Sequence, residues 1–166
     1  MNHSIGCKKT IQSPVGQLAL YATSKGIAKV DFLDSDAKSI DFASDEQSAR
    51  HCENAAQWLA RYFTNDGDFY PGPYDITGTN FQEAVWAEIS KIGFGKIRTY
   101  GEIAQQVKNP QASRAVGAAV GANPVPLLIP CHRVMGVGSR ITGYSGGEGI
   151  PTKKTLLRHE SIEFRD

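Results

Sequence analysis

Short apolar runs alternate with turn signals over the first third of the chain. In the stretch KKTIQSPVGQLALYATSKGIAKVDFL, turn residues occur at 13–16 and 24–26. This spacing predicts an antiparallel hairpin or meander over residues 7–33. Apolar residues then recur every three or four positions from Ala49 to Phe63, behind Ser44 and Asp45. That period predicts a helix, which ends at the turn residues 65–67.

Helical signals dominate the second half. Thr79 precedes NFQEAVWAEISKI, whose apolar residues share one face, and it is a candidate N-cap. Thr99 and Glu102 have the spacing of a capping box at the start of TYGEIAQQV. Asn109 and Pro110 stand where the N-cap and first position of a third helix, QASRAVGAAVGAN, are expected. Two short helices joined by a tight turn at 108–109 make a candidate helix-turn-helix.

The chain after the third helix has three parts. VPLLIPC has the composition of a buried extended segment, and the glycine-rich GVGSRITGYSGGEG predicts a loop that approaches something closely. IPTKKTLLRHE predicts a last helix with Pro151 in its first turn. The sequence therefore predicts an α+β protein, with a small N-terminal domain of antiparallel sheet plus helix over 1–78. A mainly helical, winged-helix-like domain with the helix-turn-helix follows over 79–166.

Composition narrows the class of protein. The chain has 166 residues, of which 40% are hydrophobic and 21% charged, as in ordinary soluble globular proteins. No apolar run approaches membrane-spanning length, and MNHSIGCKKT lacks a signal-peptide core, so we expect a cytoplasmic protein without membrane partners. Three cysteines exclude a full disulfide framework and predict free thiols.

The net charge of +1 conceals an asymmetry between the halves. Residues 1–78 hold 7 Lys+Arg and 10 Asp+Glu, giving −3, and residues 79–166 hold 11 and 7, giving +4. A mildly basic C-terminal half suits an anionic partner, although an ordinary solvated surface explains so small an excess about as well.

The stretch LLIPCHRVMG holds the candidate chemistry. Cys131 is followed by His132 and Arg133, and a second histidine–carboxylate pair ends at Glu160. A thiolate with a base, and an acid behind that base, is the general arrangement of an activated thiol. Cysteine hydrolases use the same groups, so these residues alone leave the reaction open.

The PCHRV signature at 130–134 is flanked by RAVGAAVGANPVPLLI, TGYSGG and LLRHE. With FQEAVW, GKIRTYGEIA and NPQASRAVGAA, the region 79–160 closely resembles the O6-alkylguanine-DNA alkyltransferases, also called methylated-DNA–protein-cysteine methyltransferases. The N-terminal half is similar mainly through SPVGQLAL. The resemblance implies DNA repair by direct damage reversal. The alkyl group of O6-alkylguanine passes irreversibly to a cysteine, once per molecule; activity on O4-methylthymine stays open.

The same resemblance implies the roles of the residues around the thiol. Cys131 would accept the alkyl group, and His132 would act as its base through a water. Glu160 would hold the imidazole in the right tautomer. Asn123 would bond across the turn that joins the third helix to the cysteine segment.

A second set of residues would hold the flipped guanine. Tyr100 would donate to the leaving base, and the backbone N–H of Ser145 would face the guanine oxygen. Tyr144 would pack against the base. The carbonyls of Cys131 and Val134 would accept from the exocyclic amine.

The resemblance also implies how DNA is bound. Arg114 would enter the base stack in place of the extruded nucleotide, and the third helix would lie in the minor groove. The implied DNA-contacting positions of that helix are Arg114, Ala115, Ala118, Ala119 and Val120. The implied partner is double-stranded DNA containing alkylated bases, and the protein would act as a monomer without a cofactor.

Other readings of the sequence differ in testable ways. His3, Cys7, His51 and Cys52 could form a zinc site, but the adjacent His51 and Cys52 chelate poorly and we expect no metal. A lesion-binding relative without chemistry would lack Cys131. A helix-turn-helix regulator would need a further domain, and a cysteine hydrolase would turn over a small substrate repeatedly.

Overall fold

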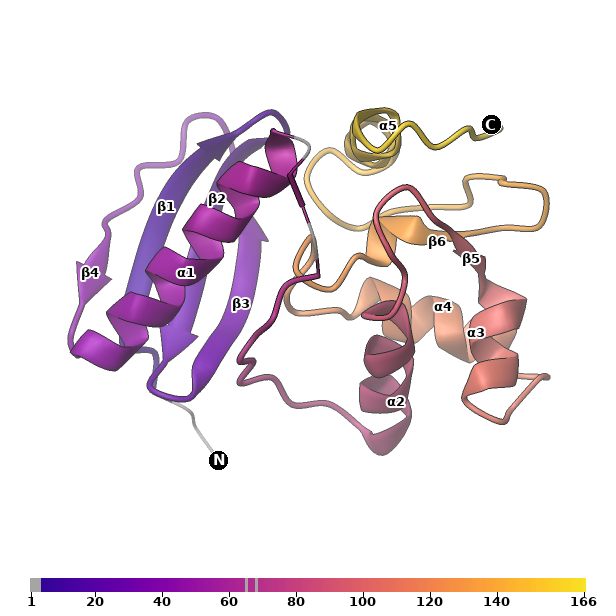
Figure 1. Ribbon diagram of the computed structural model, residues 1–166, viewed down its shortest axis with the longest axis horizontal. Helices are drawn as coiled ribbons and strands as arrows, with labels where there is room; N and C mark the ends of the chain where they lie inside the picture. Colours follow the sequence, from indigo (N-terminus) through magenta and orange to yellow (C-terminus); the bar gives the residue numbers. More distant parts are fainter. Residues whose placement is uncertain (1–3, 65, 68) are drawn as a thin grey trace. The chain divides into compact units, whose positions relative to one another are not determined.

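The turn signals of the first third separate three antiparallel strands in the computed structural model, which describes residues 4–64, 66–67 and 69–166 (Figure 1). The strands are β1 (Cys7–Ser13), β2 (Gly16–Thr23) and β3 (Gly26–Phe32). The predicted meander is therefore confirmed. A short strand, β4 (Phe42–Ala43), joins the edge of the sheet, whose order is β3-β2-β1-β4. Two residues are too few to give an alternating pattern, so the sequence did not predict β4.

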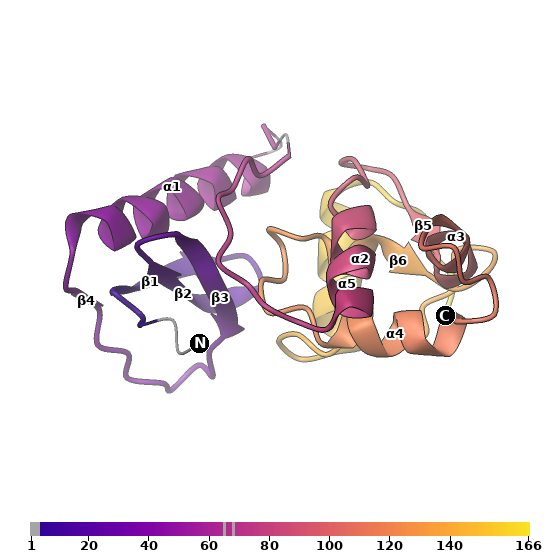
Figure 2. The same ribbon diagram turned by 90° about the horizontal axis from the view of Figure 1, so that it is seen from below.

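The helix expected after Asp45 is α1 (Glu46–Phe63), which lies across one face of this sheet (Figure 2). Of Ser44 and Asp45, the two residues expected to open the helix, Asp45 is the N-cap, and it accepts a 2.8 Å hydrogen bond from the backbone N–H of Ser48. The apolar face of α1 packs mainly on β1 and β2, and to a lesser extent on β3. The buried core of this region contains Leu18, Leu20, Ala22, Ile27, Cys52, Ala55 and Leu59.

The chain divides into two units, Met1–Ile76 and Thr77–Asp166. The second unit begins with α2 (Asn80–Ile89), followed by β5 (Arg98–Thr99), α3 (Tyr100–Gln106) and α4 (Ser113–Gly121). Both α2 and α3 start with complete capping boxes: the one at Thr99 is predicted as such, and at Thr79 the sequence predicts the N-cap. The buried indole N–H of Trp86 on α2 donates to the carbonyl of Ala119 on α4 at 2.8 Å, which ties these two helices together.

The start of α4 differs from the sequence prediction. Asn109 does not cap this helix and Pro110 is not its first residue; the N-cap is Ala112, whose side chain makes no capping bond. The Ala112 N–H instead donates to the carbonyl of Asn109 at 2.9 Å, which closes a turn with Pro110 inside it. Asn and Pro at the first two positions are as typical of a β-turn as of a helix start, and here the turn forms.

The segment VPLLIPC is buried, as predicted, but it is not extended. Leu127 has a φ of 73°, and the N–H of Ile129 donates to the carbonyl of Val125 at 3.0 Å. The chain turns here and enters the single-turn 3₁₀ helix η1 (Cys131–Arg133) and then β6 (Val134–Met135), which pairs in parallel with β5. Apolar composition alone does not distinguish a buried turn from a buried strand.

The last predicted helix is α5 (Ile150–His159), with Pro151 in its first turn. Leu157 of α5 packs with Met135, Ile141 and Ile162 in a small core that secures the glycine-rich loop between β6 and α5. In the parts of the chain that the structure describes, no helix combines the length and the apolar character that a membrane crossing requires.

Candidate active site

Cys131 lies at the start of η1 and its side chain is only 5% exposed. The turn before it is fixed by Asn123, whose amide donates to the carbonyl of Ile129 at 2.8 Å and accepts from the N–H of Val125 at 3.0 Å. The N–H of Cys131 also donates to the carbonyl of Ile129, at 2.8 Å. Asn123 therefore joins the end of α4 to the cysteine segment, in the place that the sequence suggests.

Glu160, directly after α5, is the centre of a buried polar network. Its carboxylate is 2% exposed and accepts from three donors. One oxygen accepts from Arg133 Nε at 2.7 Å and from the N–H of Gly95 at 3.0 Å, and the other bonds His132 Nε2. Because a carboxylate only accepts, His132 Nε2 carries the proton, and Nδ1 is the nitrogen with a lone pair.

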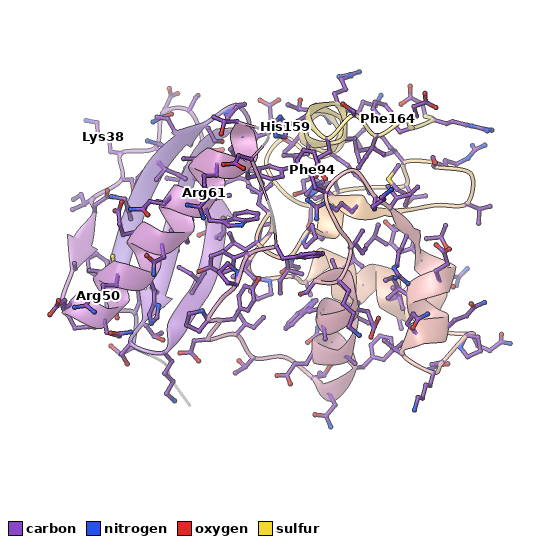
Figure 3. The ribbon with its side chains drawn as sticks, in the orientation of Figure 1. Lys38, Arg50, Arg61, Phe94, His159 and Phe164 are labelled. Carbon is purple, nitrogen blue, oxygen red and sulfur yellow. The ribbon has the colours of Figure 1, made fainter. Side chains whose placement is uncertain are left out.

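Arg133 is held from several sides. Its Nη1 donates to the carbonyl of Ile92 at 2.6 Å, and its guanidinium lies 5.9 Å from the ring centre of Phe94. The Phe94 ring in turn meets His159 edge to face, with ring centres 5.9 Å apart. Both side chains are labelled in Figure 3. Arg133 is therefore a fixed counter-charge for Glu160.

These contacts set the charges of the network. Burial acts to raise the pKa of Glu160, but the His132 hydrogen bond, the attraction to His132 when this imidazole is protonated at acidic pH, the charge of Arg133 and the Gly95 N–H outweigh it and hold this pKa at about 2. Burial lowers the pKa of His132 below its ordinary value, against the opposing effect of Glu160. At neutral pH the pair is thus a carboxylate and a neutral imidazole, and a neutral imidazole can accept a proton.

The thiol of Cys131 experiences opposing influences. Burial raises its pKa, and hydrogen bonds from the side chains of Asn123 and Tyr144 and the charge of Lys153 act in the opposite direction. Since the thiolate is the nucleophile, each group that stabilises it raises the reactivity of Cys131.

Lys153 on α5 is a residue that sequence reasoning missed. It is 1% exposed, and its ammonium donates to the carbonyls of Val134 at 2.7 Å and Gly143 at 3.3 Å. Burial lowers its pKa to about 8. A fully buried lysine with a perturbed pKa beside a cysteine indicates a functional site. In the sequence it stands among helix formers in TKKTLLRHE, where nothing separates it from the neighbouring Lys154.

A cavity of about 450 Å³ leads to the thiol. Cavities of this size bind small organic ligands. Tyr100, Tyr144 and Ser145 line it, whereas Val134 is buried and is not among the lining residues. The hydroxyl of Ser145 donates to the carbonyl of Gly121 at 3.2 Å. The lining residues are Tyr100, Ser113, Gly117, Val120, Gly121, Cys131, Thr142, Gly143, Tyr144 and Ser145.

Helix α4 borders the same cavity. The exposed residues of this helix include Arg114, Ala115 and Ala118. A helix face that contacts a partner must be exposed in this way. Ala119 differs from this expectation: it is 2% exposed, so its side chain is buried and not available to a partner, and its carbonyl accepts from Trp86 Nε1. Val120 lines the cavity.

The candidate zinc ligands do not form a cluster in the described chain. Across residues 4–64, 66–67 and 69–166, no group of three or more His, Cys, Asp or Glu side chains could hold a metal ion. His51 instead lies within hydrogen-bond distance of Gln47 and of the Ser24 carbonyl. His3, the remaining candidate, is outside the described residues.

Comparison with known families identifies the class of protein that this site and fold define. Residues 80–162 match the 6-O-methylguanine DNA methyltransferase, DNA binding domain, and residues 7–69 match the ribonuclease-like domain of the same methyltransferase. The methylated-DNA–protein-cysteine methyltransferase of Haemophilus influenzae is 34% identical over 93% of this chain and 86% of its own length. That of Methanosarcina barkeri is 37% identical over 93% and 97%. The chain belongs to the 6-O-methylguanine DNA methyltransferase family.

Solved structures agree with this assignment. The crystal structure of Mycobacterium tuberculosis OGT in complex with DNA matches with a TM-score of 0.78 at 34% identity, covering 93% of this chain and 92% of that one. The crystal structure of the M. tuberculosis O6-methylguanine methyltransferase matches with a TM-score of 0.76 at 35% identity, covering 96% and 95%. The resemblance and the fold class that the sequence predicts are confirmed.

The Glu160 network predicts how stability depends on pH. The folded-state pKa values of His132 and Glu160 both lie below their ordinary values of 6.5 and 4.5. The unfolded chain therefore binds more protons at acidic pH, and the free energy of unfolding falls as the pH drops from 6.5 toward 2. Urea unfolding of a Trp58→Phe variant, in which Trp86 fluorescence reports the second unit, would measure this.

Substitution of Glu160 measures how much this residue contributes to the free energy of unfolding and to its pH dependence. Glu160→Gln leaves the buried Arg133 without a counter-charge, so we expect a loss of about 3–5 kcal/mol at pH 7 and a weaker pH dependence below 4.5. Glu163→Gln, which alters an exposed carboxylate of the same unit, is the matched control and should change neither quantity. Parallel pH curves for Glu160→Gln and the wild type would contradict the assigned charges.

Lys153 should control the reactivity of Cys131. In Lys153→Met the thiol loses a nearby positive charge and its pKa rises further, and each unit of rise reduces the thiolate fraction about tenfold. We expect Cys131 to react with iodoacetamide about tenfold more slowly at pH 7. The difference should narrow above pH 8, where Lys153 itself loses its proton. Lys154→Met is the control, and equal rates for both variants would contradict this role.

Proposed function

We propose that this protein repairs alkylated DNA by transferring the alkyl group from O6 of guanine to Sγ of Cys131. The observation that carries the proposal is the position of Cys131: it lines a cavity of about 450 Å³, and its neighbour His132 is bonded to buried Glu160. The family membership defines the substrate class. The thioether formed does not hydrolyse, so each molecule reacts once and needs no cofactor.

The attacking group is the Cys131 thiolate. It forms when the proton of the thiol passes through a water to Nδ1 of His132, while Nε2 stays bonded to Glu160. Sγ then attacks the alkyl carbon, the S–C bond forms and the C–O6 bond breaks, leaving its electron pair on guanine. Asn123 supports this step in two ways, because it fixes the turn before Cys131 and its side chain helps to lower the pKa of the thiol.

The leaving guanine needs donors for its charge. Tyr100 at the start of α3 lines the cavity and would donate its phenolic proton to the base, and the N–H of Ser145 would face O6. Tyr144 would pack on the base. The carbonyls of Cys131 and Val134 would accept from the exocyclic amine; the Val134 carbonyl already accepts from Lys153, and its second lone pair would serve the base.

A base within a duplex cannot reach a buried thiol, so the nucleotide must be flipped out of the stack. We assign Arg114 to the space that it leaves. Arg114 is exposed on α4, and no ion pair holds it within the described parts of the chain. The small side chains of Ala115 and Ala118 favour a close approach of α4 to the minor groove, and the +4 charge of residues 79–166 favours DNA. We propose that the protein is a monomer and acts in the cytoplasm, where DNA is accessible and thiols stay reduced.

Intact mass spectrometry after incubation with a duplex containing one O6-methylguanine tests the proposal. We expect one methyl group per protein, mapped by peptide analysis to Cys131. Cys7→Ser and Cys52→Ser should react normally, and Cys131→Ser should gain no methyl. Methylation of Cys7 or Cys52, or more than one product per protein, would contradict the single-use reaction. Tight binding of the lesion without transfer would indicate a lesion-binding protein instead.

Arg114→Ala should slow repair of duplex DNA much more than reaction with free O6-benzylguanine. The reason is that Arg114 is exposed on α4 and does not line the cavity. Single-turnover rates on both substrates would measure the difference, with Arg140→Ala, which alters an exposed arginine outside α4, as the control. Equal losses on the two substrates would show that Arg114 acts elsewhere.

A further inference from the structure

Two hydroxyl groups meet at the wall of the cavity. The hydroxyl of Thr142, in the loop between β6 and α5, lies 3.1 Å from the phenolic oxygen of Tyr100 at the start of α3. Both residues line the cavity that leads to Cys131. The two hydroxyls are therefore within hydrogen-bond distance at the place where a base would lie.

The Thr142 side chain is held in one orientation by its neighbours. A Cβ atom at Gly136 would lie 3.0 Å from the Thr142 methyl group and 3.1 Å from the carbonyl of Arg140. The Thr142 methyl group therefore occupies space that is open only because residue 136 is a glycine. Because a β-branched side chain has few allowed χ1 values, fixing the methyl group also fixes the direction of the hydroxyl, toward Tyr100. The adjacent Ile141 is buried in the small core and anchors this loop.

The Tyr100 ring is also fixed, but its hydroxyl proton is not. Thr99 caps α3 directly before it, and the ring lies next to Gly117 of α4, where an added Cβ would meet it at 3.9 Å. A phenol can still turn its O–H bond either toward Thr142 or into the cavity. A guanine that leaves as an anion accepts hydrogen bonds, so the productive arrangement has the proton in the cavity.

We propose that Thr142 is a positioning residue for the transfer reaction: it donates to the Tyr100 oxygen and so directs the Tyr100 proton toward the departing guanine. This inference rests on the donor role proposed for Tyr100. As the C–O6 bond breaks, electron density moves onto the base and is met by the Tyr100 O–H. The Tyr100 oxygen then becomes more negative, and the Thr142 O–H stabilises it. A chain of donors polarises each member in this way.

The contribution should appear only when a base fills the cavity. Thr142 is exposed, so water competes for its hydrogen bond while the cavity is open. A bound guanine excludes that water, and hydrogen bonds are electrostatically stronger in a dry site. The effect is therefore expected in the rate of transfer and not in DNA affinity.

A double-mutant cycle tests this inference. The variants are Thr142→Val, which keeps the shape and removes the hydroxyl, Tyr100→Phe, and the combination of both. Single-turnover transfer from a methylated duplex and the dissociation constant of that duplex are measured for each. We expect Thr142→Val to slow transfer about 3- to 10-fold, the worth of one hydrogen bond between neutral groups, with unchanged DNA binding. In the Tyr100→Phe background the same change should have no further effect.

Three controls separate positioning from structural damage. Thr142→Ser restores the hydroxyl and should recover most of the rate. Thr155→Val removes an exposed threonine hydroxyl that donates to the Pro151 carbonyl within α5, and it should react normally. The reaction of Cys131 with iodoacetamide should be equal in Thr142→Val and wild type, because the attacking thiol is untouched.

Each contrary result has a distinct meaning. If Thr142→Val slows transfer equally in the wild-type and Tyr100→Phe backgrounds, Thr142 acts independently of Tyr100 and the inference is wrong. A normal rate for Thr142→Val beside a slow Tyr100→Phe also overturns it. A normal rate for Tyr100→Phe removes the donor role and this inference together. Absence of methyl on Cys131 in every variant, wild type included, would overturn the proposed function itself.

Discussion

A carboxylate without water around it must find its partners inside the protein, and Glu160 finds three. The N–H of Gly95 comes from the loop after α2, Arg133 and His132 come from η1, and Glu160 itself follows α5. Removing a partner would leave a buried charge uncompensated, which is among the costliest defects that a core can have. This requirement fixes the end of α5 and η1 relative to each other. The tautomer of His132 and the position of Cys131 depend on that arrangement.

The same carboxylate explains why Arg133 is as closely held as His132. A histidine alone could not keep Glu160 ionised in the core without being protonated itself. Arg133 supplies a permanent positive charge, so His132 can remain neutral and keep a lone pair. The arginine of the PCHRV sequence thus neutralises the charge of Glu160. This role differs from stabilising the thiolate directly, as a basic residue near a thiol can do.

Much of this fold can be predicted from the sequence, because the local sequence signals favour the same helices and strands as the tertiary packing does. The capping boxes at Thr79 and Thr99, the Asp45 cap and the β1–β3 meander depend on residues within a few positions of one another. The resemblance to the alkyltransferases implied roles for Cys131, His132, Glu160 and Asn123 together. The prediction was wrong where one sequence pattern is typical of two different local structures. Asn109–Pro110 suits a turn and a helix start equally, and VPLLIPC suits a buried turn and a buried strand.

Other residues were not predictable because their roles depend on long-range contacts. Lys153 differs from Lys154 only in the direction of its side chain, which the packing of α5 decides. Ala119 is buried whereas the adjacent Ala118 is exposed, and an error of one position in the helical phase would exchange the two. Thr142 gains a role only because Gly136 leaves room for its methyl group and Tyr100 lies opposite.

The burial of Cys131 has a consequence for the lifetime of the unused protein. A molecule that reacts once must keep its thiol intact until a lesion arrives, amid peroxides and other electrophiles that attack exposed thiolates. Burial raises the pKa of Cys131 and leaves the residue 5% exposed, so the resting protein presents little thiolate to small oxidants. The burial that makes activation of the thiol necessary thus also protects the thiol before it reacts. This explains why a nucleophile that reacts only once lies at the end of a cavity.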